Sequence, residues 1–295
     1  MFMSRRLMVL ATVVLLAIPR VAAAQTVKIG SKNFTEQFII AEIYAAALEN
    51  GGFKVERKIN LGGTLIAQKA IEAGEIDLYP EYTGTALVAV LKAPVKSNPQ
   101  EVFEEVKAYY EKNFGLTWLK PANINNGYAI LVRPETAAKY QLKTLADLGG
   151  GPSKQLIMGA GPEFLDRQDG LPGLKAVYGI EFKEFKQFAK IGLRYDALTA
   201  KQIDVANGFA TDWQIAEQKL AVLEDTKSLF PPYYLAPVIR EQTLKANPKI
   251  ADILEKVDAA LDNATMRELN TKVERDKDEP KDVAIAFLKS KGLIK

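Results

Sequence analysis

Apolar residues recur along the chain in short runs that alternate with longer stretches of helical periodicity. The first unit is an apolar strand at 27–29, a break at Gly30 and a helix that reaches Glu49. Asn33, followed three residues later by Glu36, has the spacing of a capping box and predicts where this helix begins. Strands that alternate with helices in this way favour a parallel sheet covered by helices.

The same rhythm continues through the chain. Further strands are predicted at 53–59, 76–79, 128–132, 156–159, 182–185 and 203–209, and helices at 64–73, 99–114 and from 247 onward. Thr64 is expected to cap its helix, and residues 144–151 are expected to form a loop. No low-complexity linker interrupts the pattern, so two domains would be joined by crossing strands rather than by a flexible tether.

Two segments of the chain resemble each other. "AIEAGEIDLYPEYTGT" at 70–85 can be laid on "ALTAKQIDVANGFATD" at 197–212, which places Asp77 on Asp204 and Tyr82 on Phe209. A chance match between two helix–turn–strand units is one explanation. The other is that the chain holds two related α/β lobes, each with an aromatic residue at the carboxyl end of a strand, where ligands bind in open α/β sheets.

Residues 1–24 have the pattern of a secretory signal peptide. Arg5 and Arg6 precede the uncharged run 7–18, and three alanines at 22–24 offer a cleavage site. A membrane anchor is the weaker interpretation, because a bilayer span needs about 20 apolar residues. Removing this segment takes away three arginines and leaves 36 basic and 36 acidic residues, a balance that argues against a nucleic-acid partner.

The chain contains no cysteine and no histidine, which narrows the chemistry. Without cysteine there is no disulfide, no thiol nucleophile and no site for a lipid at the cleavage position, so we expect a freely diffusing exported protein in a bacterial periplasm. Without histidine, Ser-His-Asp and Cys-His enzymes are excluded, while carboxylate or Ser-Lys enzymes are not. The Gly-rich stretches 62–64 and 149–152 lack the spacing of a phosphate loop, and no metal or cofactor motif is expected.

Three motifs carry a resemblance to a known family: "KIGSKNFTEQFIIAEI", "GGTLIAQKAIEAGEIDLYPEYTGTAL" and "FPPYYLAPVIR". They resemble the substrate-binding proteins of ABC importers for quaternary ammonium osmoprotectants such as glycine betaine, choline, carnitine and proline betaine. The resemblance implies an α/β, two-lobed periplasmic binding protein of type II, the Venus-flytrap fold, with the ligand cleft between the lobes. Lobe I would comprise 25–123 and 231–295, and lobe II 124–230. The closed form would dock on an ABC permease in the inner membrane, and we expect a monomer that is not an enzyme.

The chemistry of such a ligand accounts for aromatic residues at strand ends. A trimethylammonium group is cationic but has no N–H donor, so a carboxylate cannot hydrogen-bond it, whereas an aromatic face attracts it by roughly 0.5–2 kcal/mol. The resemblance places such a cage at Tyr82, Tyr128, Phe209 and Tyr233. Phe209 stands where the family usually has tyrosine, and Trp213 replaces a small residue, so the selectivity is expected to differ.

A betaine also carries a carboxylate at its far end. The resemblance assigns this group to Lys32 in "GSKNFTEQ", to Thr85 at the start of a helix, and to Arg167 in "EFLDRQDG". Backbone N–H groups at a helix start favour anions, and a guanidinium can hold a carboxylate with two hydrogen bonds.

Other functions stay open at this point. The same fold could bind choline, carnitine, a betaine of histidine, another cationic metabolite or an ordinary amino acid. A periplasmic enzyme could work with the carboxylates of Glu81 and Asp77. A ligand-sensing partner of a membrane receptor would share the fold.

Overall fold

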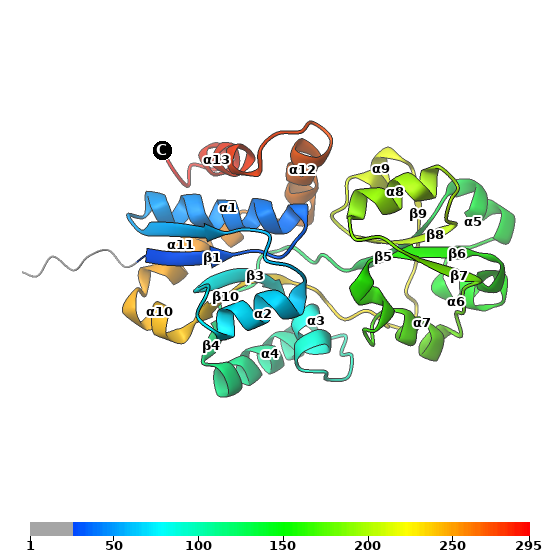
Figure 1. The fold of residues 1–295 in the computed structure, drawn as a ribbon, viewed down its shortest axis with the longest axis horizontal. Coiled ribbons are helices and arrows are strands. Elements are labelled where there is room, and N and C mark those ends of the chain that lie inside the picture. The colour runs from blue at the N-terminus through cyan, green and yellow to red at the C-terminus, as the bar shows by residue number, and fades with distance from the viewer. Residues whose placement is uncertain (1–25) are drawn as a thin grey trace, which may run out of the picture.

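The molecule has two lobes that lie side by side along its long axis (Figure 1). The computed structural model describes residues 26–295, so the predicted signal peptide at 1–24 lies outside the described residues. Each lobe is built on a five-stranded sheet covered by helices. None of the helices in the described range combines the length and the apolar character needed to traverse a membrane.

Lobe I, as we call the lobe on the left of Figure 1, contains both ends of the described chain. Its strands follow the order β2-β1-β3-β10-β4. Its elements are β1 (Thr26–Gly30), α1 (Thr35–Asn50), β2 (Lys54–Lys58), α2 (Thr64–Glu72), β3 (Leu78–Tyr82), α3 (Thr83–Thr85), a π-helix (Ala86–Val90), α4 (Pro99–Phe114), β4 (Leu116–Trp118), β10 (Leu235–Arg240), α10 (Glu241–Ala246), α11 (Lys249–Asp258), α12 (Asn263–Glu274) and α13 (Pro280–Ser290).

Lobe II is formed by the middle of the chain, with the strand order β7-β6-β8-β5-β9. Its elements are β5 (Tyr128–Val132), α5 (Pro134–Tyr140), α6 (Leu145–Gly149), a 3₁₀ helix (Pro152–Gln155), β6 (Ile157–Ala160), a second 3₁₀ helix (Pro162–Leu165), α7 (Leu171–Tyr178), β7 (Glu184–Gln187), α8 (Ile191–Thr199), β8 (Val205–Phe209), α9 (Gln214–Glu217) and β9 (Ala221–Leu223).

Two extended segments, 119–127 and 224–234, connect the lobes. They are hydrogen-bonded to each other near the middle of the molecule, where the N–H of Asn126 donates to the carbonyl of Tyr233 at 3.0 Å and Asn125 pairs with Tyr234. Because backbone hydrogen bonds join the two crossings, the lobes are linked by a short ribbon and not by a flexible tether. The lobe boundaries inferred from the sequence stay a prediction.

The two lobes share one topology, as the internal similarity in the sequence predicts. In each sheet the third strand, β3 or β8, is parallel to one neighbour and antiparallel to the other. Asp77 and Asp204 precede these strands in equivalent positions, and their carboxylates accept backbone N–H groups of Lys28 at 2.8 Å and Ile157 at 3.0 Å. The equivalence supports the reading of the segments at 70–85 and 197–212 as related units.

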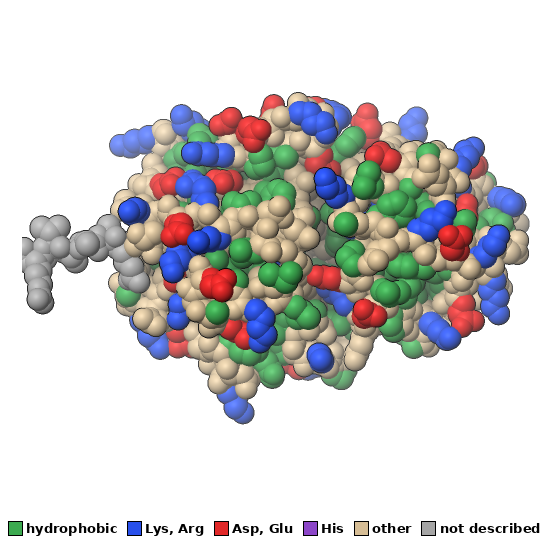
Figure 2. Space-filling view, viewed as in Figure 1, with side chains coloured by type: hydrophobic (Ala, Val, Ile, Leu, Met, Phe, Trp, Pro, Cys, Tyr) green, Lys and Arg blue, Asp and Glu red, His purple; other side chains and the backbone are tan. Residues whose placement is uncertain are grey.

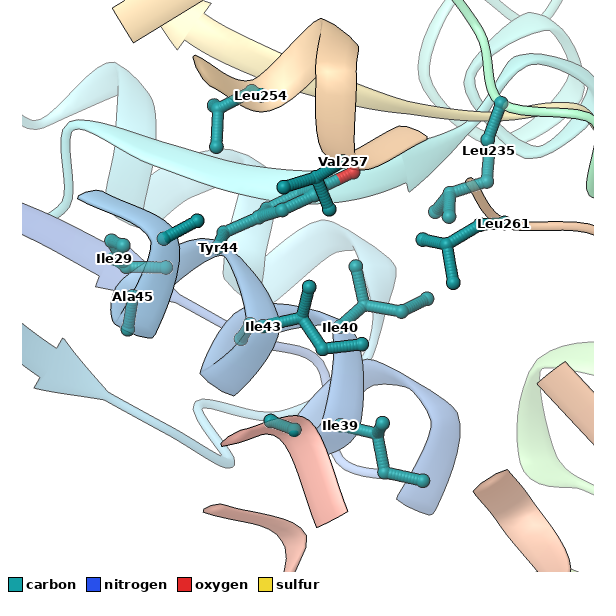
Figure 3. Packing of buried hydrophobic residues seen from close by; sticks show 14 of the residues in the cluster. Ile29, Ile39, Ile40, Ile43, Tyr44, Ala45, Leu235, Leu254, Val257 and Leu261 are labelled. Atoms are coloured by element: carbon teal, nitrogen blue, oxygen red, sulfur yellow. The ribbon is translucent and has the colours of Figure 1, made fainter. Parts of the chain in front are cut away.

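Helix α1 is the centre of the larger core. It packs against α11, α12 and α13 on one side and the lobe I sheet on the other, so nearly its whole circumference is buried (Figure 3). Ile39, Ile43 and Tyr44 are fully buried there, and each such side chain contributes roughly 1.5–3 kcal/mol by leaving water. The Tyr44 hydroxyl donates to Asp258 at 2.8 Å, which fixes α1 against α11. This packing holds the first turn of α1 rigidly at the interlobe cleft.

Four local predictions differ from the structure. The capping box at Asn33 and Glu36 is absent: Phe34 is the N-cap residue without a side-chain cap, because tertiary partners take the Glu36 carboxylate. Gly63, not Thr64, caps α2. Residues 144–151 contain helix α6, which Thr144 caps. Both sheets are mixed rather than parallel, since β10 and β5 return antiparallel beside strands remote in sequence.

Candidate ligand-binding site

Two adjoining hollows lie between the lobes. A wide cleft of about 930 Å³ is lined by both lobes, and in Figure 2 the surface is hollowed where they meet. A smaller inner pocket of about 60 Å³ shares six lining residues with this cleft. Those shared residues are Lys32, Phe34, Thr64, Tyr128, Glu163 and Phe209.

All seven residues predicted from the sequence as ligand contacts line the inner pocket. They come from six separate segments of the chain and from both lobes. They are Lys32, Tyr82, Thr85, Tyr128, Arg167, Phe209 and Tyr233. The structure therefore brings the predicted set together in one place, and the roles of its members in binding stay predictions.

Five aromatic rings, which we call the ring cluster, form the walls of this pocket. Phe34 lies between Tyr82 and Phe209, with its ring centroid 6.3 Å from the former and 6.2 Å from the latter in stacked arrangements. Tyr128 stacks on Phe209 at 5.4 Å and meets Tyr233 edge-on at 5.7 Å. Rings from both lobes thus present their faces and edges to one small space.

Strand topology explains how the rings meet. Tyr82 ends β3 and Phe209 ends β8, so the two are equivalent positions in the two lobes. Tyr128 begins β5 directly opposite Phe209 in the antiparallel register. Phe34 follows β1 and was missed by the sequence analysis, although its place just beyond the carboxyl end of a strand is where ligands bind in α/β sheets.

Two of the cluster tyrosines donate their hydroxyls to buried carboxylates. The Tyr82 hydroxyl lies 2.6 Å from Oε1 of Glu36, and the Tyr233 hydroxyl lies 2.5 Å from Oδ2 of Asp169. Burial and the neighbouring Glu36 carboxylate raise the pKa of Tyr82 well above its ordinary value. Each hydroxyl therefore keeps its proton and donates it to the neighbouring carboxylate.

Glu36 is a buried junction that the sequence analysis missed. Its carboxylate accepts four hydrogen bonds of 2.5–3.2 Å. The donors are Tyr82, Asn126 of the connecting segment 119–127, Thr211 of lobe II and Asn270 of α12. Burial raises its pKa, and these four donors counteract that rise. The Glu36 side chain thus connects the ring cluster to the segment 119–127 and to lobe II by hydrogen bonds.

Two cations at the pocket already hold acidic partners. Lys32 Nζ lies 2.5 Å from Oε1 of Glu81, with both side chains buried, and 5.1 Å from the centre of the Tyr82 ring. The guanidinium of Arg167 holds Asp169 through Nε and Nη2, at 2.7 and 2.5 Å. A ligand carboxylate at either cation would share it with a protein carboxylate.

Helix starts also reach the pocket. Thr85 lies in the first turn of α3, which begins directly after Tyr82. At the start of α2, the Glu163 carboxylate of lobe II accepts the Thr64 N–H at 2.8 Å and the Thr64 hydroxyl at 3.2 Å. This is a direct hydrogen-bonded contact across the cleft, and it occupies a helix start that would favour an anion.

Trp213 and Asp212 shape the lobe II side of the cleft. The indole N–H of Trp213 donates to Glu274 of α12 at 2.8 Å, and both residues line the wide cleft. Asp212 accepts the Tyr195 hydroxyl at 2.7 Å and the Phe209 N–H at 2.9 Å. Asp212 therefore fixes the backbone that carries the Phe209 ring.

The carboxylates considered for an enzyme do not face the hollows. Asp77 accepts backbone and hydroxyl donors inside lobe I, and Glu81 is fully buried against Lys32. Neither residue lines the wide cleft or the inner pocket. Across residues 26–295, no group of His, Cys, Asp and Glu is placed to hold a metal ion.

The fold and the pocket together define a two-lobed solute-binding protein with an aromatic site between its lobes. Residues 25–290 match the family model described as the substrate binding domain of ABC-type glycine betaine transport system. The chain belongs to this family, which confirms the family and the fold class expected from the sequence.

Individual relatives carry different ligands in their names. The chain is 34% identical over 283 residues to a glycine-betaine-binding protein of Pseudomonas aeruginosa, covering 92% of this chain and 90% of that protein. It is 38% identical over 266 residues to the ergothioneine transport permease/ergothioneine binding protein EgtU of Helicobacter pylori. That match covers 90% of this chain but 47% of the relative, so the chain spans about half of that protein.

A solved structure matches at the level of the whole fold. The crystal structure of a glycine betaine/carnitine/choline ABC transporter has a TM-score of 0.75 and 32% sequence identity. The match covers 90% of this chain and 99% of that one. The chain is thus a substrate-binding protein of an ABC transport system in sequence and in fold.

Proposed function

We propose that this protein captures a quaternary ammonium compatible solute, such as glycine betaine or choline, between its lobes and delivers it to an ABC importer. The observation that carries the proposal is the ring cluster: Phe34, Tyr82, Tyr128, Phe209 and Tyr233 converge from both lobes on one pocket. A cation without N–H donors gains most from such faces, since each ring attracts it by roughly 0.5–2 kcal/mol.

The buried carboxylates assist this binding from behind the rings. Glu36 and Asp169 cannot hydrogen-bond a trimethylammonium group, and in contact with it they would be desolvated without a donor. Through the hydroxyls of Tyr82 and Tyr233 their charge reaches the pocket as a more negative ring face. Lys32, Thr85 and Arg167 would then receive the carboxylate of a short ligand such as glycine betaine, in competition with Glu81 and Asp169 at the two cations.

Binding requires movement of the lobes. An inner pocket of about 60 Å³ has room for only a few water molecules, so the rings must separate before a trimethylammonium group can enter. The cluster contains residues of both lobes, so the ligand contacts all of it only in a closed state and selects that state by its differential affinity.

The remaining proposals concern where the protein acts and what it delivers its ligand to. We infer export to the periplasm from the pattern of residues 1–24, and a monomeric, non-lipidated receptor that presents its closed form to an inner-membrane permease. No catalytic step is proposed, since the two carboxylates considered for one, Asp77 and Glu81, line neither hollow.

Isothermal titration calorimetry on protein refolded from urea, to remove carried-over ligand, tests the proposal. Glycine betaine, choline or carnitine should bind one to one and raise the melting temperature. 3,3-Dimethylbutanoate, the isostere of glycine betaine with carbon in place of the quaternary nitrogen, should bind about tenfold more weakly or worse, because it keeps the shape and the carboxylate but lacks the positive charge. Equal affinity for both, or no binding of any quaternary ammonium compound, would refute the proposal.

A larger trimethylated ligand is the second candidate. The wide cleft of about 930 Å³ continues outward from the ring cluster, and the relative with 38% identity is named for ergothioneine binding. A betaine of histidine would place its trimethylammonium group against the rings and its heteroaromatic ring in the cleft. The same titration with ergothioneine beside glycine betaine decides between the two.

A further inference from the structure

Three enclosed cationic side chains line the hollows between the lobes, and one of them differs from the other two. Lys32 is neutralised by Glu81 at 2.5 Å, and Arg167 by Asp169 at 2.5 Å. Arg194 of α8, only 5% exposed, makes no ion pair with any acid in the part of the chain that the structure describes.

The hydrogen bonds of Arg194 use one nitrogen. Nη1 donates to the backbone carbonyl of Asn207 at 2.9 Å and to its side-chain oxygen at 2.7 Å. Nε is enclosed and has no hydrogen-bond partner within residues 26–295, and Nη2 lies close to Gly161, where an added Cβ would be 3.0 Å away. Nε and Nη2 form the edge with which Arg167 holds Asp169, and in Arg194 this edge carries no acid.

An enclosed guanidinium without a counter-ion is costly, and burial lowers the pKa of Arg194 accordingly. Asp212 acts on it through space, but its carboxylate is engaged by Tyr195 and by the Phe209 N–H. Burial also raises the pKa of Asp212 to about 7, so at neutral pH this acid is only partly ionised. The guanidinium of Arg194 is therefore left without an ion-pair partner among the described residues.

Arg194 lies next to the ring cluster, on the side of the wide cleft. Asn207, which binds the guanidinium, precedes Phe209 by two residues on β8, so their side chains leave the strand on the same face. Arg194, Asn207 and Phe209 all line the wide cleft, but only Phe209 among them lines the inner pocket. An anion at Arg194 would thus belong to the part of a ligand that extends beyond the ring cluster.

We infer that Arg194 forms an anion subsite in the wide cleft, which binds a carboxylate or similar acidic group remote from the ammonium end of a zwitterionic ligand. This inference rests on the proposed function and narrows the substrate class: the ligand is an extended trimethylated zwitterion, longer than glycine betaine. A guanidinium edge matches a carboxylate with two parallel hydrogen bonds, as Arg167 shows with Asp169.

The test compares ligands that share the trimethylammonium group. Calorimetry is run with carnitine, whose carboxylate is remote, and with choline, which has none, on the wild type, Arg194→Gln and Lys190→Gln. Lys190 is an exposed cation lining the same cleft, so its variant controls for loss of charge alone. Arg194→Gln should lower the affinity for carnitine about tenfold or more and change the affinity for choline by less than about twofold. Lys190→Gln should change neither affinity.

A second variant keeps the guanidinium in place. Asn207→Asp has nearly the same shape and puts a counter-ion where the side-chain oxygen now accepts Nη1 at 2.7 Å. This variant should lower the affinity for carnitine and leave the affinity for choline unchanged or higher, with an unchanged or higher melting temperature. If either variant lowered the affinities for both ligands by the same factor, the subsite would be overturned while the ring cluster stood. If the wild type binds no quaternary ammonium compound, the proposed function fails, and the subsite with it.

Discussion

The hydroxyl of Tyr82 and the carboxylate of Glu36 form a 2.6 Å hydrogen bond at the edge of a ring that lines the inner pocket. Glu36 is 3% exposed and lies on the first turn of α1, while Tyr82 ends β3. The same arrangement recurs across the cluster, where Tyr233 donates to Asp169. Two buried carboxylates are thereby held one ring away from the inner pocket.

Removal of the Tyr82 hydroxyl should weaken binding without removing the ring. In Tyr82→Phe we expect affinity for choline to fall about threefold, and in Tyr82→Ala to fall further, by up to about thirtyfold, which corresponds to roughly 2 kcal/mol for one cation–π contact. Tyr79→Phe is the matched control, since its buried hydroxyl bonds Gln68 and Glu81 away from the pocket. Calorimetry measures all three, and an unchanged affinity in Tyr82→Ala would contradict the cage.

Replacement of Glu36 should lower stability. Glu36→Gln keeps the shape but turns one acceptor into a donor, so at least one of the groups that now donate to it, among them Thr211 and Asn270, loses its acceptor. We expect the free energy of unfolding to fall by about 1–3 kcal/mol in urea denaturation. Glu56→Gln, an exposed change on β2, should shift it by less than about 0.5 kcal/mol. A Glu36 variant as stable as this control would show that the junction is not structural.

Phe34 should behave as a member of the ring cluster. Its ring lies between Tyr82 and Phe209, so Phe34→Ala opens a gap where a cation would lose one aromatic face. We expect affinity for choline to fall about tenfold. Phe38→Ala is the control, because Phe38 lies one turn further along α1 and lines the wide cleft but not the inner pocket. Similar losses in both variants would mean that the effect is not local to the pocket.

The strand-end residues could be predicted because their positions are encoded locally. The repeated helix–turn–strand pattern around Asp77 and Asp204 fixes two equivalent strands, and each ends in an aromatic residue. The antiparallel return of β10 beside β3 could not be read in this way, since Leu235 pairs with Tyr82 across more than 150 residues. Local pattern therefore predicted the parallel strands of each sheet and also β5, but it missed β4, β9 and β10 and the antiparallel pairing.

Residues whose roles are set by distant partners were misread or missed. Asn33 and Glu36 have capping-box spacing, yet the Glu36 carboxylate accepts hydrogen bonds from four donors elsewhere in the fold instead of capping the helix. Arg194 looks like an ordinary helix-surface arginine in the sequence, and only the fold shows that it is enclosed without an acid. Tertiary competition of this kind has no signature in a single sequence.

The interlobe hydrogen bonds of Glu163 should favour closure of the free protein. Glu163→Ala removes the acceptor of the Thr64 N–H at 2.8 Å, and we expect a larger radius of gyration by small-angle X-ray scattering without ligand. Because the Glu163 side chain is 42% exposed, the loss of ligand affinity should be no more than about threefold. Glu184→Ala, an exposed change on β7, should leave both quantities unchanged. A variant as compact as the wild type would rule out a closing role.

Asp212 should make stability depend on pH near neutrality. Burial raises its pKa to about 7 from an ordinary 3.8, with Tyr195, the Phe209 N–H, Glu274 and Arg194 as the groups that face it. Between these two pH values the folded protein holds a proton that the unfolded chain has released. Its contribution to stability is therefore fully present below about pH 4 and is lost as the pH rises toward 7, by at most about 1.4 kcal/mol per pH unit.

Asp212→Asn mimics the protonated side chain and should flatten this dependence. Glu36 and Asp258, whose pKa values are also raised by burial, add slopes of the same sign, so the difference between wild type and variant isolates Asp212. Urea denaturation from about pH 5 to about pH 8 should show the variant gaining stability relative to the wild type as the pH rises. Asp196→Asn, an exposed change on α8, should run parallel to the wild type. Parallel curves for Asp212→Asn as well would mean that this carboxylate is already ionised in the folded protein, and that a full negative charge holds the Phe209 backbone at the pocket.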